Sequence, residues 1–125
     1  MKEVLFVAAG GAVGSSLRYL LSSGIYAWYG RAFPWGTLAV NVLGSFAIGL
    51  LSILLVEKFN VAQEWRLAIV VGVLGGFTTF SAFSWDTLDL MQQGLTVKAL
   101  VNVMANVLLC IVAAWLGAVW AKSFV

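Results

Sequence analysis

The chain has 125 residues, of which 62% are hydrophobic and only 10% are charged, and its formal net charge is +2. Soluble domains carry roughly 25% charged residues, so this composition excludes an ordinary water-soluble domain and predicts an integral membrane protein. With one cysteine and no histidine, the chain also lacks the residues for an intramolecular metal site of the Cys/His kind.

Four apolar stretches predict an all-α membrane protein with four transmembrane helices in one domain, residues 1–125. Each stretch is close to the ~20 residues that cross a hydrocarbon core. The connections are too short for a soluble domain, so we expect the functional residues to lie within the membrane and expect no nucleic-acid partner. The expected spans are residues 4–21, 34–56, 66–91 and 97–120.

The basic residues give almost no preference for one orientation in the membrane. An excess of Lys and Arg on cytoplasmic loops normally sets the orientation, and here the two sides carry four and three. Insertion in both orientations is therefore expected, and its natural product is an antiparallel, dual-topology homodimer. The alternative is a single orientation set by folding and the translocon. The counted residues are Lys2, Lys58, Arg66 and Lys122 on the side of the termini, and Arg18, Arg31 and Lys98 on the other.

The first span contains Gly10 and Gly14, whose four-residue spacing is typical of close helix packing. Arg18 lies near the end of the same span, where a guanidinium is costly unless it reaches water. Two interpretations are open for Arg18: it lines an aqueous vestibule that attracts anions, or its side chain extends to the membrane interface.

The second span carries Thr37, Asn41, Ser45 and Gly49 at four-residue spacing, which places them on one helical face. The Asn41 amide offers two hydrogen-bond donors without a formal charge. We interpret this polar face as part of an anion path. An intramembrane asparagine can also simply join helices, so this alternative stays open.

The third span contains the run GGFTTFSAFS, residues 75–84, which should break the helix. A broken helix in a membrane is tolerated where protein or a water-filled cavity satisfies the backbone, and such breaks mark ion or substrate sites. We expect the interruption at residues 75–79, near the bilayer midplane. In an antiparallel dimer, the Gly75 and Thr78 carbonyls of both subunits could then form an oxygen cage around a monovalent cation.

Beyond the expected break, Phe77, Phe80 and Phe83 recur every three residues next to Ser81 and Ser84. Aromatic stripes usually pack, but ring edges carry partial positive charge and can face an anion. An anion path needs hydrogen-bond donors and groups with partial positive charge, whereas a lysine in the path would trap the ion.

The fourth span repeats the amide donors. Asn102, Asn106 and Cys110 share one helical face there, and we assign Asn106 to the proposed anion path. Asp86 and Asp89, near the end of the third span, are expected at the interface or in solvent and are not assigned to the pore.

The run at residues 75–84, the segment GTLAVN at residues 36–41 and the glycine-rich first span with Arg18 resemble the CrcB/Fluc family of fluoride ion channels over the entire chain. The resemblance implies a passive fluoride channel that lowers intracellular fluoride toxicity. It also implies a dual-topology antiparallel dimer with two pores and a central structural sodium ion, in a bacterial inner membrane.

The resemblance also implies roles for single residues. The pore asparagine of the family corresponds to Asn41, and its pore phenylalanines correspond to Phe80 and Phe83. Its vestibule arginine corresponds to Arg18, and the hydroxyl groups along its pore correspond to Thr37, Ser81 and Ser84. The carbonyl groups that bind its sodium ion correspond to those of Gly75 and Thr78.

Other classes of membrane protein fit the sequence less well. A small proton-coupled exporter of cationic drugs should have a carboxylate deep in its first span, whereas the only early acid here is Glu3 at the terminus. A membrane scaffold would explain the packing glycines but not a polar face beside a helix break. An enzyme is not expected, because no nucleophile–base pair or metal-ligand cluster is visible.

Overall fold

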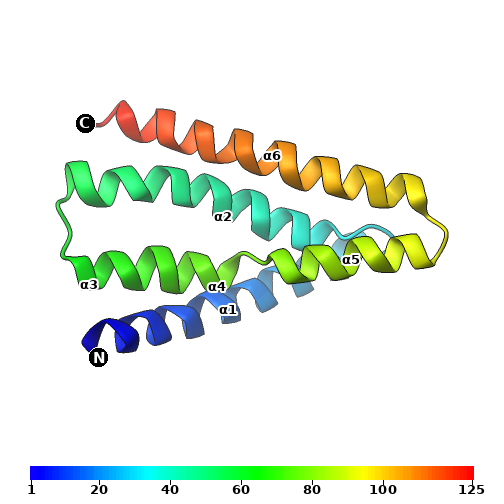
Figure 1. The fold of residues 1–125 in the computed structure, drawn as a ribbon, viewed down its shortest axis with the longest axis horizontal. Coiled ribbons are helices and arrows are strands. Elements are labelled where there is room, and N and C mark those ends of the chain that lie inside the picture. The colour runs from blue at the N-terminus through cyan, green and yellow to red at the C-terminus, as the bar shows by residue number, and fades with distance from the viewer.

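The computed structural model describes all residues from Met1 to Val125 and contains four helices long and apolar enough to cross a membrane. They run side by side, and both chain ends lie at the same end of the bundle (Figure 1). Contacts confirm this arrangement of the ends, since Lys2 forms an ion pair with Glu64 and Lys98 donates a hydrogen bond to the Ala32 carbonyl. The four spans are Lys2–Tyr29, Trp35–Lys58, Gln63–Gln92 and Thr96–Lys122.

The first span is one helix, α1 (Lys2–Tyr29), which continues past residue 21, the end expected from the sequence. Residues 22–29 remain helical because the segment contains no proline and its one glycine, Gly24, keeps the helical conformation. Ser22 Oγ donates to the Arg18 carbonyl one turn earlier. The helix ends at Gly30, whose φ of 74° is readily available only to glycine.

The second and fourth spans form one close pair. The second combines α2 (Trp35–Ile53) with a turn of π-helix, η1 (Leu54–Lys58), and the fourth is α6 (Thr96–Lys122). At their contact, a side chain on Gly49 would overlap the Ala114 carbonyl of α6, and one on Gly117 would overlap the Phe46 carbonyl of α2. Small residues are what allow membrane helices to approach this closely.

The first and third spans form the other close pair. The third begins with α3 (Gln63–Arg66) and the π-helical η2 (Leu67–Leu74). A side chain on Gly10 of α1 would overlap the Ala68 carbonyl, and one on Gly14 would overlap the Val73 carbonyl. The packing role predicted for these two glycines is therefore what the structure shows.

The third span then continues as α4 (Gly75–Phe77) and α5 (Phe80–Gln92), with Thr78 and Thr79 in extended conformation between them. Figure 1 shows this non-helical connection about halfway along the span. We expected the interruption to begin at Gly75, but Gly75 is helical, with φ −62° and ψ −38°. The interruption is shorter because Thr79 starts the next helix at once: its Oγ1 accepts the Ala82 N–H as an N-cap.

Candidate functional site

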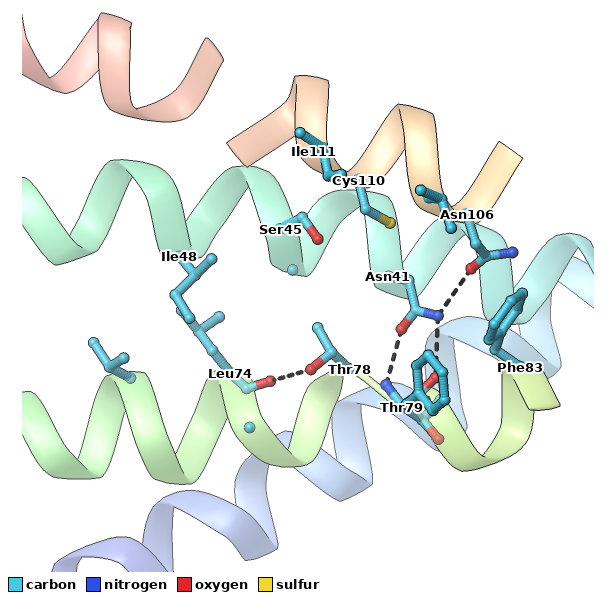
Figure 2. Close-up of a pocket in the computed structure, with 15 residues that line it drawn as sticks. Asn41, Ser45, Ile48, Leu74, Thr78, Thr79, Phe83, Asn106, Cys110 and Ile111 are labelled. Carbon is cyan, nitrogen blue, oxygen red and sulfur yellow. Dashed lines mark hydrogen bonds between the residues drawn. The ribbon is translucent and has the colours of Figure 1, made fainter. Parts of the chain in front are cut away.

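A cavity of about 440 Å³ lies between the two close helix pairs, beside the interruption of the third span (Figure 2). Its wall comes from α2, η2, α4, α5, α6 and the two threonines between α4 and α5. The wall is largely apolar, and no Asp, Glu, Lys or Arg lines it. The polar side chains that line it are Asn41, Ser45, Thr78, Thr79, Asn106 and Cys110.

Asn41 connects α2 to the interruption. Its Oδ1 accepts the Thr79 N–H at 2.8 Å, and its Nδ2 donates to the Thr79 carbonyl and to Asn106 Oδ1, each at 3.1 Å. Asn41 Oδ1 thus replaces the carbonyl that would accept the Thr79 N–H in a continuous helix (Figure 2). Both amide hydrogens predicted to face an anion have acceptors within the protein, so an anion at Asn41 would compete with Thr79 and Asn106 for them.

Phe80 and Phe83 lie at the start of α5 and both line the cavity. Their ring centroids are 5.3 Å apart in an edge-to-face arrangement, as the charge distribution of aromatic rings favours. Phe83 is buried, whereas Phe80 is 77% exposed. The Phe80 ring is therefore largely accessible at the surface of the chain.

The Gly75 and Thr78 carbonyls lose their normal hydrogen-bond donors at the interruption. In a continuous α-helix, Thr79 N–H would bond to Gly75 and Ala82 N–H to Thr78. Here these donors bind Asn41 Oδ1 and Thr79 Oγ1 instead. Carbonyl oxygens are suitable ligands for a hard cation. The donor set at Gly75 and Thr78 therefore fits the sodium ion that the resemblance implies.

The structure brings together only part of the predicted anion path. Asn41, Phe80, Phe83 and Asn106 line the cavity, as do both predicted carbonyl residues, Gly75 and Thr78. The predicted residues that do not line it are Thr37, Ser81, Ser84 and Arg18.

Thr37 is engaged elsewhere. Its hydroxyl donates to Asp86 Oδ2 at 2.7 Å and lies 3.3 Å from the Tyr26 hydroxyl. Asp86 is half-buried, so it is not fully solvated, and its position is compatible with the interfacial placement that we expected. This contact could not be inferred from spacing along the sequence, because Thr37 and Asp86 belong to different spans.

The other three predicted residues outside the cavity make no contact with a different span through a hydrogen bond or ion pair. Ser84 is exposed and donates to the Phe80 carbonyl of its own helix, and Ser81 is exposed with its hydroxyl 3.4 Å from Thr79 Oγ1. Arg18 is half-buried on α1 and forms no ion pair. Both interpretations of Arg18, as a vestibule residue or as an interfacial one, remain compatible with this position.

Several lining residues were not assigned to the path from the sequence. Ser45 and Cys110 belong to polar faces that the spacing did reveal, so those faces were the available signal. Gly44 is explained only by the structure, because a side chain there would overlap the Thr78 methyl group.

Comparison with known proteins agrees with these features. Residues 5–118 match the model of the family described as CrcB-like protein, Camphor Resistance (CrcB). The chain belongs to the CrcB family. The resemblance read from the sequence is thereby confirmed, and this CrcB-family chain is a multi-pass membrane protein with the four spans described above.

Three similar relatives each bear the name fluoride-specific ion channel FluC. The relative from Magnetococcus marinus is 53% identical over 117 residues, which cover 94% of this chain and 95% of the relative. The relative from Geobacter sulfurreducens is 50% identical over 123 residues, covering 98% and 99%. The relative from Methylococcus capsulatus is 49% identical over 116 residues, and there the match covers 93% of this chain but spans about half the relative's length, 51%.

Proposed function

We propose that this CrcB-family chain forms a passive, fluoride-selective channel that exports fluoride from the bacterial cytoplasm and so lowers its toxicity. The observation that carries the proposal is the sequence identity of 50–53%, over nearly the full length of the chain, to proteins named fluoride-specific ion channels. The cavity supports the same chemistry, since amide and hydroxyl groups and two aromatic rings line it. The protein is a transport protein and not an enzyme.

The cavity wall contains no charged side chain, which supports passive transport. A proton-coupled carrier needs a titratable group that alternates between protonation states in its pathway, and no acidic or basic side chain lines this cavity. The driving force for fluoride is then its own electrochemical gradient.

Purified protein in liposomes should release fluoride, and not chloride, at a rate limited by charge compensation. We expect rapid fluoride efflux when valinomycin lets potassium follow, and almost none without the ionophore. Matched chloride gradients serve as the control for selectivity. Full-rate efflux without valinomycin, accompanied by a stoichiometric pH change in the lumen, would replace the channel by a proton-coupled carrier.

We further propose that the active form is an antiparallel homodimer with two pores and a central sodium ion. The exposed Phe80 ring and the exposed Gly75 lie at the margin of the cavity, where a second copy could cover them. The interruption about halfway along the third span fits a site at the bilayer midplane, on the axis of the dimer. There, the Gly75 and Thr78 carbonyls of both copies would hold the ion, which would neutralise their facing partial charges.

Gly75→Val tests the proposed cage. A side chain at Gly75 meets no atom closer than the Val70 carbonyl, 3.9 Å away, so the protomer should tolerate valine and only the dimer contact should suffer. We expect dimer assembly, measured by crosslinking in membranes, and sodium-dependent stability to fall together. Gly24→Val is the matched control, because Gly24 is exposed on α1 with no atom within 4 Å of an added side chain.

Thr78→Ser provides the second comparison. Serine retains the Thr78 carbonyl and can keep the hydroxyl bond to the Leu74 carbonyl, now 3.0 Å long. It should therefore have much less effect than Gly75→Val. Equal damage from the two changes would indicate a side-chain ligand and contradict the carbonyl cage.

A further inference from the structure

Asn102 on α6 is fully buried, yet it does not line the cavity. Its Nδ2 donates to Thr87 Oγ1 of α5 at 2.9 Å, and the Thr87 hydroxyl donates in turn to the Phe83 carbonyl at 2.8 Å. A buried amide is costly unless it is hydrogen-bonded, and both polar atoms of this one have partners. The transport pathway described above makes no use of Asn102 or Thr87.

Asn102 is connected to the cavity through Asn106. Asn106 Nδ2 donates to Asn102 Oδ1 at 3.0 Å and to the Asn102 carbonyl at 2.9 Å. Asn106 Oδ1 then accepts from Asn41 Nδ2, and Asn41 binds both backbone groups of Thr79. A continuous series of hydrogen bonds therefore runs from α5 through α6 and α2 to the interruption of the third span.

Each side-chain amide in this series of hydrogen bonds can adopt only one donor–acceptor orientation. Thr79 N–H can only donate, so Asn41 must present its oxygen to Thr79 and its nitrogen to Asn106. Asn106 must then turn its own nitrogen to Asn102, and Asn102 its nitrogen to Thr87. Reversing one amide would place donor against donor and oxygen against oxygen. Each amide thus fixes the orientation of the next.

We propose that Asn102 and Thr87 are positioning residues for the channel: through Asn106 they hold the Asn41 amide in the orientation that keeps Thr79 extended and the Gly75 and Thr78 carbonyls free. This inference rests on the proposed function. Its physical content is separate, because the state of the Thr79 backbone can be measured without any transport assay.

Thr87→Val tests the proposal with little change in shape, because valine removes the hydroxyl that accepts from Asn102. Thr87→Ser is the matched control that keeps this hydroxyl. In full-length protein in lipid nanodiscs, we expect Thr87→Val to accelerate hydrogen exchange in residues 75–83 while exchange in α1 is unchanged. Fluoride flux in liposomes should fall roughly threefold to tenfold, in proportion to the loss of an interhelical hydrogen bond. Thr87→Ser should match the wild type in both measurements.

Asn102→Leu keeps a similar side-chain volume and removes both side-chain hydrogen bonds of Asn102, the one to Thr87 and the one from Asn106. Its effect on exchange in residues 75–83 should be at least as large as that of Thr87→Val. Because the two residues act through one hydrogen bond, adding Thr87→Val to Asn102→Leu should reduce flux no further. If Asn102→Leu does not fold, the Thr87 pair alone decides the question.

Two results would overturn the proposal. One is wild-type exchange in residues 75–83 of a folded Thr87→Val protein. The other is an equal acceleration of exchange throughout the bundle, which would mean that Asn102 and Thr87 only join helices. A wild-type protein that carries no fluoride would refute the proposed function, while the exchange measurement would still test the positioning role.

Discussion

Phe80→Ile should reduce fluoride flux by roughly tenfold or more without changing the stability of the single chain, since a loss of ~1.4 kcal/mol at the barrier is tenfold in rate. Isoleucine keeps much of the apolar volume but removes the ring edge that can face a small, strongly hydrated anion. Phe80 is 77% exposed in the protomer, so its replacement leaves no internal cavity. Efflux from liposomes and the thermal unfolding of the protein measure the two effects separately.

Phe59→Ile is the matched control for this substitution, because Phe59 is also exposed, at 59%, and does not line the cavity. Phe83→Ile should likewise reduce flux, but Phe83 is buried and its replacement will also lower stability. If Phe80 served only for packing, flux would follow the amount of dimer. Wild-type flux in an intact Phe80→Ile dimer would exclude the ring from the pathway.

Asn41→Asp should have an even larger effect on the same pathway. A carboxylate cannot donate to the Thr79 carbonyl or to Asn106 Oδ1, and it adds a buried negative charge beside the proposed anion path. The expected flux is close to background. The gel-filtration profile of the purified protein shows whether the loss concerns the proposed pathway or the fold.

Lysines added at one end of the bundle should give a protein with a single orientation and no activity. The end with both termini carries four basic residues and the other carries three, so two lysines appended after Val125 are enough to create a clear excess. An opposite variant carries Gln92→Lys, Gln93→Lys and Thr96→Lys, all at exposed positions of the other end. Each variant alone should lack an antiparallel partner, and co-expression of the two should restore fluoride efflux.

The orientation itself can be checked by labelling a cysteine introduced at the C-terminus from either side of the membrane. Two appended glutamines are the control, because they lengthen the chain equally and add no charge. Full activity of a variant whose molecules all share one verified orientation would rule out the antiparallel dimer.

The sequence was sufficient for the four spans, because a hydrocarbon core requires long apolar helices and the chain contains four of them. It was less accurate at the ends. The first helix extends to Tyr29 because no proline interrupts it and the single glycine of residues 22–29, Gly24, is tolerated in helical conformation, although serine and aromatic residues made this segment look like a connection.

At the candidate site, spacing along single helices indicated the polar faces that contain Asn41 and Asn106, and the structure places both residues in one cavity wall with Phe80 and Phe83. Spacing could not reveal that Thr37 contacts Asp86 or that the Asn41 amide is fully engaged by Thr79 and Asn106. Those contacts join different spans and depend on how the helices pack, which the glycines permit but periodicity does not describe.

The pairing of the spans has a consequence for the order of events during synthesis. α1 packs through Gly10 and Gly14 on the third span, and α2 packs through Gly49 on α6, so each of the first two helices has its closest partner two spans later in the chain. When the first two helices leave the ribosome, neither of these glycine faces has its partner. The α1 pair can form once the third span has entered the membrane, but the α2 pair forms only after Gly117 has entered it, so the bundle is complete only when the last helix is made.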